Sequence, residues 1–155
     1  MSESKKNELK INIDAEQERQ KPRLVAILLF DFASQTNEGK QNILGIFDRV
    51  KVSVDKKRTP PIGFYLKTAH TFDDQIQVAI LSPENQLVAG FFFGAPEKER
   101  DGKKLTQMQI LGIVEFDTPM AGEYWIDVSY KEQSLGGFRL VVDFVDTKEE
   151  GDGSK

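Results

Sequence analysis

Hydrophobic and polar residues alternate with a period of two along most of the middle of the chain. In the clearest case, Ile76, Val78 and Ile80 alternate with Gln75, Gln77 and Ala79, as in a strand with one buried face. Other runs of strand length, either continuously apolar or alternating at least in part, occupy residues 24–30, 42–54, 64–69, 87–93, 105–116, 124–130 and 138–144. Turn signals separate most of these runs, and no run of useful length has the helical period. The pattern therefore predicts an all-β fold, an antiparallel two-sheet β-sandwich of about eight strands, with a closed barrel as the alternative.

The longest uninterrupted apolar run covers the seven residues from Leu24 to Phe30. A run of this length is typical of a strand that is covered on both faces. It is much shorter than the roughly 20 residues that a membrane-spanning helix needs. Residues 1–6 do not resemble a secretory signal, because no apolar stretch follows their lysines. We therefore expect no membrane contact and a cytoplasmic location.

The two ends of the chain differ in composition from its middle. Residues 1–22 are polar apart from a short alternation of Leu9, Ile11 and Ile13, which leaves a short edge strand as an alternative to a mobile tail. Residues 146–155 are small and charged, which is typical of disorder. The sequence thus predicts one sandwich domain over residues 23–145, between a mobile polar N-terminal tail and a disordered C-terminal tail.

Composition removes most familiar kinds of catalytic and metal site. The 155 residues include no cysteine and one histidine, His70, so disulfides, cysteine nucleophiles and multi-histidine zinc sites are excluded. A net charge of −4 argues against non-specific binding to nucleic acid, which depends on neutralising phosphates. We expect a protein that is not an enzyme, needs no cofactor and does not bind nucleic acid.

Two early segments resemble a known family. Residues 26–33 end in Asp31-Phe32-Ala33, residues 42–49 read Asn-Ile-Leu-Gly-Ile-Phe-Asp-Arg, and Pro60-Pro61 follows. This order resembles an uncharacterised bacterial family, a domain of unknown function, whose members have a strand ending in Asp-x-Ala and then an Asn-x-x-Gly-x-Phe-Asp-Arg strand. The resemblance covers roughly residues 25–144. It has implications for the fold and implies no activity.

A later segment resembles the corner that enters a late strand of immunoglobulin-type sandwiches. Residues 117–126 contain Gly122-Glu123-Tyr124, which matches the Gly-x-Tyr pattern of that corner. In those domains the tyrosine hydroxyl bonds to the backbone just upstream, and the resemblance gives Tyr124 this role. Ile126 stands where antibody domains have a cysteine. The likeness implies an immunoglobulin-like sandwich and carries no information on ligands.

Four residues provide the raw material for a metal site. Asp73 and Asp74 follow His70 at the end of a predicted strand, and Asp117 lies near the end of another. Calcium takes oxygen ligands, but the chain has no calcium-loop signature. We favour a solvated turn for Asp73 and Asp74, and a strand-end loop position for His70. A carboxylate calcium site stays as an alternative.

Asp31 and Asp48 differ from the other acids because they lie among apolar residues. A buried carboxylate needs hydrogen-bond donors or a cation, and Arg49 follows Asp48 directly. Two carboxylates without a histidine or a defined pocket are weak evidence for catalysis. We therefore expect Asp31, Asp48, Arg49 and Tyr124 to form a structural polar network.

Two aromatic side chains are the best candidates for a contact surface. In the run Phe91-Phe92-Phe93, the side chain of Phe92 points to the opposite side from its neighbours. Trp125 lies between Tyr124 and Ile126, whose side chains are expected to point to the other face of the strand. Most aromatic residues are buried or partly covered. If Phe92 and Trp125 point outward, they would form a platform for a protein or a sugar.

A basic segment formed by Lys51 and residues 56–58 precedes the stiff Thr59-Pro60-Pro61 sequence. A patch for an anionic partner is one interpretation. We favour a solvated loop, since runs of charge usually form exposed surface.

These patterns favour a non-catalytic protein-binding or assembly module, acting on a protein partner or on itself as a homodimer. A binding site for a small ligand or carbohydrate at Phe92 and Trp125 is the first alternative. A calcium site built from Asp73, Asp74 and Asp117 or His70 is the second. Fold class alone does not decide between them.

Overall fold

The computed structural model describes residues 22–69, 75–93, 99–100, 103–104 and 107–147. They form eleven strands: β1 (Arg23–Gln35), β2 (Gln41–Phe47), β3 (Arg49–Ser53), β4 (Ile62–Ala69), β5 (Ile76–Leu81), β6 (Leu87–Phe93), β7 (Glu99–Arg100), β8 (Lys103–Lys104), β9 (Gln107–Val114), β10 (Gly122–Tyr130) and β11 (Gln133–Val145). Within these described ranges, no helix is long and apolar enough to cross a membrane. The predicted tails lie outside the described residues except for Pro22, Asp146 and Thr147.

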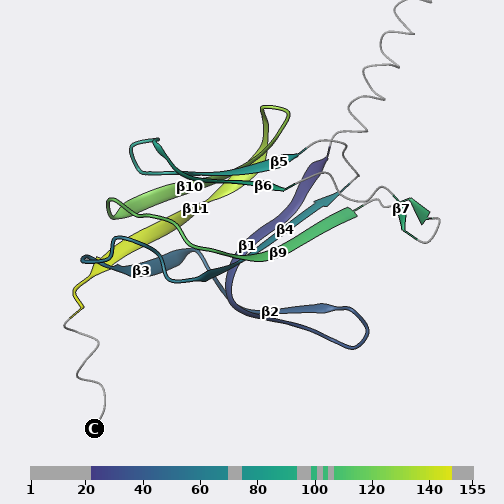
Figure 1. The fold of residues 1–155 in the computed structure, drawn as a ribbon, viewed down its shortest axis with the longest axis horizontal. Coiled ribbons are helices and arrows are strands. Elements are labelled where there is room, and N and C mark those ends of the chain that lie inside the picture. Colours follow the sequence, from purple (N-terminus) through teal and green to yellow (C-terminus); the bar gives the residue numbers. More distant parts are fainter. Residues whose placement is uncertain (1–21, 70–74, 94–98, 101–102, 105–106, 148–155) are drawn as a thin grey trace, which may run out of the picture.

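Nine of the strands form two sheets that pack face to face (Figure 1). The four-stranded sheet has the order β2-β1-β4-β9, and the five-stranded sheet has the order β3-β11-β10-β5-β6. β7 and β8 pair only with each other among the described strands. The predicted immunoglobulin-like two-sheet sandwich is therefore confirmed. One pair of neighbours departs from the antiparallel pattern, because β3 runs parallel to β11 from Arg49↔Val141 to Ser53↔Val145.

The predicted single strand over residues 42–54 is in fact two strands in different sheets. β2 pairs with β1, β3 pairs with β11, and the chain crosses between the sheets at Asp48. There the Asp48 carbonyl oxygen accepts a hydrogen bond from the Val141 amide at 2.8 Å. The hydrophobic pattern does not reveal this crossover, because β-branched residues continue on both sides of it.

The core lies between the sheets and takes alternate residues from each strand. Along β5 the buried side chains are Ile76, Val78 and Ile80, as the alternation predicts. Phe64 of the first sheet stacks on Phe93 of the second, with ring centroids 6.1 Å apart. This packing makes the sandwich a firm support for the surface features described below.

Tyr124 forms the predicted corner at the start of β10. Its hydroxyl donates a hydrogen bond to the Met120 carbonyl oxygen at 2.7 Å, and the ring is fully buried against Phe116. Burial raises the pKa of the Tyr124 hydroxyl above its ordinary value, and the hydrogen bonding with the Met120 backbone opposes this shift. The corner supports the immunoglobulin-like fold independently of the strand order.

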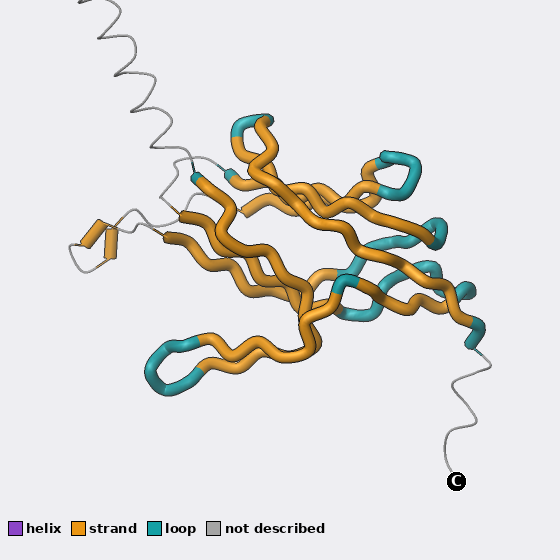
Figure 2. Tube along the Cα trace, turned by 180° about the vertical axis from the view of Figure 1, so that it is seen from behind, coloured by secondary structure: helices purple, strands orange, loops and turns teal. Residues whose placement is uncertain are grey.

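The first hairpin projects out of the sandwich as an arm, defined here as residues 31–45. β1 pairs with β4 only as far as Phe30, and beyond that point it pairs with β2 alone among the described strands. Figures 1 and 2, which view the molecule from opposite sides, both show this ribbon leaving the body. The turn at its tip is closed by Thr36, which accepts hydrogen bonds from Gly39 and Lys40.

Candidate functional site

Five large apolar side chains are exposed on the outer side of the four-stranded sheet and its arm. Their exposed fractions range from 46% for Leu111 to 75% for Ile113. We call this set the apolar face; it consists of Phe32, Leu44, Ile46, Leu111 and Ile113. Soluble proteins seldom expose large contiguous apolar patches unless these patches bind something.

Strand register explains why these residues share one side of the sheet. Phe30 lies opposite both Ile46 and Gly63, and Gly63 lies opposite Ile113. Residues opposite each other in paired strands point to the same face. One step further along the arm, Phe32 lies opposite Leu44 on the same side. The apolar face therefore runs from the arm across β1 and β4 to the edge strand β9.

A hollow of about 520 Å³ lies where the arm meets the sheet. Its lining comes from three strands and the segment before β4: Phe30, Asp31, Phe32, Ala33, Pro61, Gly63, Leu111, Gly112 and Ile113. Phe30 points to this outer side yet is buried, because its ring lies over Gly63. A Cβ atom at Gly63 would come within 2.7 Å of three carbons of that ring. Glycine at this position thus lets an aromatic ring form the floor of the hollow.

The expectation that strand 24–30 is covered on both faces is corrected by this arrangement. Leu29 on its inner face is buried, but Val25 is exposed and Leu28 is only half-buried. An uninterrupted apolar run shows that both faces of a strand are apolar. It does not show that the same chain covers both.

Phe92 and Trp125 both point outward, with exposed fractions of 64% and 43%. They lie on the other sheet from the apolar face, and β5 separates their strands. Phe92 lies opposite Gln77 of β5, and Gln77 lies opposite Ser129 of β10. Ser129 is four residues along β10 from Trp125. That offset is about 13 Å along the strand and about 10 Å across it. The two rings are therefore too far apart to form one stacking platform.

The polar residues expected to act together are separate in the structure. Asp31 and Asp48 are exposed rather than buried, and Arg49 pairs with Asp143 at 2.7 Å. Tyr124 serves the corner described above. The physical reason is that Asp31 lies on the arm and Asp48 at the crossover, where apolar sequence neighbours do not create an apolar environment.

The proposed calcium ligands are not assembled by the described residues. His70, Asp73 and Asp74 lie outside those residues. Asp117 accepts a hydrogen bond from the Arg58 guanidinium at 2.7 Å, and Glu115 lies 3.5 Å from the same group. The bond to Asp117 is the main cause that raises the pKa of Arg58. In the part of the chain that the structure describes, no three histidine, aspartate or glutamate side chains gather as a metal site.

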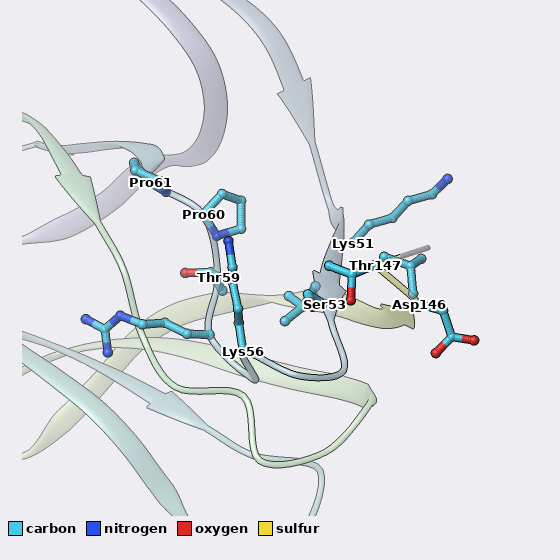
Figure 3. A pocket seen from close by; sticks show the side chains of 11 residues that line it. Lys51, Ser53, Lys56, Thr59, Pro60, Pro61, Asp146 and Thr147 are labelled. Carbon is cyan, nitrogen blue, oxygen red and sulfur yellow. The ribbon is translucent and has the colours of Figure 1, made fainter. Parts of the chain in front are cut away.

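A second hollow, of about 620 Å³, lies beside the basic segment (Figure 3). β3, residues 56–61 and the end of β11 form its walls. Figure 3 shows the Lys56 side chain running toward Pro60, while Lys51 and Asp146 point away from the body. Lys51 and Lys56 therefore do not converge on one point, which agrees with the interpretation of a solvated loop.

Residues 25–143 match the model of a protein family described as a Family of unknown function (DUF6941). The chain belongs to this family. Its predicted membership of an uncharacterised domain family is thereby confirmed. No curated protein matches the sequence. Among solved structures, an immunoglobulin-like protein from Pseudomonas aeruginosa is similar to this DUF6941 member, with 16% identity, a TM-score of 0.43, and coverage of 79% of this chain and 97% of the other.

The apolar face was missed by sequence reasoning, although a signal for it exists. In the predicted strand over residues 105–116, Ile110 and Val114 share one face, which packs on the core. Leu111 and Ile113 stand between them on the opposite face of the strand. A strand that is apolar on both faces at the edge of a sheet is the pattern that would have predicted this surface.

Proposed function

We propose that this DUF6941 protein is a non-catalytic protein-binding module that contacts its partner through the apolar face. One observation carries the proposal: five large apolar side chains are exposed on one side of the four-stranded sheet and of the arm that projects from it. A protein surface that covers them removes them from water, which is the main favourable term in protein association. The cytoplasmic location expected from the sequence stays a prediction.

The size of this term sets a requirement for the partner. Burying a large apolar side chain completely contributes about 1.5–3 kcal/mol. Five side chains that are half to three-quarters exposed then contribute on the order of 5 kcal/mol in total. Association costs about 4–15 kcal/mol in lost freedom of motion. The apolar face alone therefore supports weak binding, and a stable complex needs additional contacts.

The alternatives have less support in the geometry. A sugar platform at Phe92 and Trp125 requires two rings that are neighbours, and β5 lies between their strands. A calcium site that includes Asp117 requires a carboxylate that is not already engaged by Arg58. Among the described residues, the apolar face is the surface on which several exposed groups of one chemical kind meet.

Capture experiments with two matched variants test the proposal. Ile113→Asp places a charge on the apolar face, and Leu87→Asp places one at a similarly exposed position of the other sheet. Tagged wild-type protein and both variants are used to capture partners from cells that naturally produce the protein, and the captured proteins are compared by mass spectrometry. Circular dichroism verifies that both variants are folded.

We expect a partner that wild type and Leu87→Asp retain and Ile113→Asp loses at least tenfold. A second copy of the chain counts as such a partner. Loss with Leu87→Asp alone, or retention by all three proteins, would place the binding surface elsewhere.

A further inference from the structure

Among the described strands, β9 is an edge of the four-stranded sheet. All eight of its residues pair with β4, from Gln107↔Ala69 to Val114↔Ile62, without a break in register. On its other side, no strand among the described residues pairs with it. A strand at the edge of a sheet presents backbone N–H and C=O groups that can pair with another strand.

The composition of β9 lacks the features that usually protect such an edge. Its sequence, Gln-Met-Gln-Ile-Leu-Gly-Ile-Val, contains no charged residue and no proline. Proteins commonly guard edge strands with charges, proline, bulges or local twists. The backbone pairing of β9 with β4 is regular, so no bulge turns this edge away from an approaching strand.

The other edges of the two sheets each have some protection. β3 carries Arg49 and Lys51. β6 has an irregular register where it pairs with Leu81 of β5. β2 is interrupted by Gly45, whose φ angle of +69° departs from strand geometry. β9 is therefore the edge best suited to strand addition.

We propose that β9 pairs antiparallel with β9 of a second copy around a two-fold axis, which joins two four-stranded sheets into one continuous sheet. This inference rests on the proposed protein-binding function and names its partner. Antiparallel pairing of one strand with its own copy is self-complementary, as a two-fold dimer requires. It would place like charges opposite each other if the strand were charged, and β9 carries none.

The pairing also supplies the additional contacts that a stable complex through the apolar face needs. Backbone hydrogen bonds form along β9, and Leu111 and Ile113 of the two copies become neighbours across the new strand pair. Side chains opposite each other on adjacent strands shield one another from water. The apolar faces of the two copies then adjoin on the same side of the joined sheet.

The absence of cysteine makes disulfide trapping a direct test. Gln109, Leu111 and Ile113 lie on the outer side of β9, and each is replaced singly by cysteine in the full chain. A disulfide needs Cα atoms about 4.4–6.8 Å apart, and opposite residues of antiparallel strands are about 4.5–5.5 Å apart. The three variants are oxidised singly, and then as mixtures of Gln109→Cys with Leu111→Cys and of Leu111→Cys with Ile113→Cys.

We expect wild type to sediment as a dimer at high concentration, and one of the five pairs of positions (109–109, 109–111, 111–111, 111–113 or 113–113), distinguished by peptide mass, to cross-link at least tenfold more than the other four. The dominant pair identifies the register, because residue numbers opposite each other around a two-fold axis have a constant sum. Leu87→Cys, an exposed position at the other sheet's edge, is the control and should cross-link little.

A wild-type protein that stays monomeric at every concentration would overturn the self-pairing. So would a dimer that cross-links at Leu87→Cys and at none of the β9 positions. A different result would refute the proposed function, namely that Ile113→Asp has no effect on partner capture. A monomer that captures a different protein through Ile113 would refute the β9 pairing and leave the apolar face as the binding surface.

Discussion

Gly63 determines how Phe30 can lie on the outer side of the four-stranded sheet. The ring of Phe30 occupies the space that a Cβ atom at Gly63 would need, and both residues line the hollow beside the arm. Gly112 on the adjacent strand β9 provides a contrast, because a Cβ atom there would meet nothing within 4 Å. Gly63 is therefore required by the packing of Phe30, whereas Gly112, a near neighbour in the same sheet, has room for a side chain.

This contrast predicts unequal effects of the same substitution. Gly63→Ala should lower the free energy of unfolding by about 1–3 kcal/mol, because the Phe30 ring must move out of its position. Gly112→Ala should change it little. Urea denaturation of wild type and both variants measures the difference. Equal effects would contradict the role assigned to Gly63.

Tyr124 gives a second prediction for a single residue. Tyr124→Phe removes the hydrogen bond to the Met120 carbonyl and should lower the free energy of unfolding by about 1 kcal/mol at neutral pH. Tyr65→Phe is the control, because burial also raises the pKa of Tyr65 but its hydroxyl has no hydrogen-bond partner among the described residues. We expect Tyr65→Phe to have a clearly smaller effect at neutral pH.

The same variant has a pH signature. The folded-state pKa of Tyr124 is raised above the ordinary value of 10.0, so its phenolate forms more readily in the unfolded chain. The stabilisation is complete below pH 10 and is lost as the pH rises further. The difference in stability between wild type and Tyr124→Phe should therefore shrink above pH 10. A constant difference up to pH 11 would show that Tyr124 does not titrate as described.

At the scale of elements, residues 57–59 form hydrogen bonds with residues 116–118, in the segment that follows β9. The Thr59 side-chain oxygen accepts a hydrogen bond from the Phe116 amide at 3.1 Å, and the Thr118 amide donates to the Lys57 carbonyl at 2.8 Å. The exposed ion pair of Arg58 with Asp117 lies beside these bonds. Buried hydrogen bonds contribute more here than the ion pair, which is solvated and screened.

Two buried threonines test this ranking. Thr59→Val leaves the Phe116 amide without its acceptor and should lower the free energy of unfolding by about 1–2 kcal/mol. Thr118→Val is the matched control, because its side-chain oxygen is buried and has no hydrogen-bond partner among the described residues. It should be neutral or slightly stabilising. Thermal and urea denaturation measure both, and a larger loss for Thr118→Val would refute the assignment.

Element boundaries show how far the sequence could predict this fold. The alternation in β5 and the Gly122-x-Tyr124 corner led directly to the right structures, because burial and the corner bond are local in sequence. The crossover at Asp48 and the parallel pairing of β3 with β11 were not predictable in this way. They depend on which distant strand supplies hydrogen bonds, and a period-two pattern carries no such information.

For the whole molecule, the apolar face and the β9 edge form one continuous surface. Leu111 and Ile113 belong to both, and neither the arm nor the described strands cover them. A contact surface was predicted at Phe92 and Trp125 because outward aromatic residues are conspicuous in a sequence. The apolar face, with four aliphatic residues and one aromatic residue, becomes a surface only when three strands and the arm are placed side by side.

The absence of charge in β9 predicts how self-association responds to salt. Raising sodium chloride from about 0.1 M to about 1 M shortens the Debye length from about 10 Å to about 3 Å, which weakens interactions between exposed charges. Pairing through β9 should therefore change its dissociation constant by less than about threefold over this range. Sedimentation equilibrium measures the constant. Weakening by tenfold or more would indicate an interface held together by charges.

Hydrogen exchange at two protein concentrations tests the central claim most directly. Backbone amides of β9, residues 107–114, should exchange more slowly at high concentration, because pairing with a second copy protects the edge. Amides of β3 and β6, the edges of the other sheet, should exchange at the same rate in both samples. Concentration-dependent protection of β6 or β3 without protection of β9, or none at all, would contradict the account.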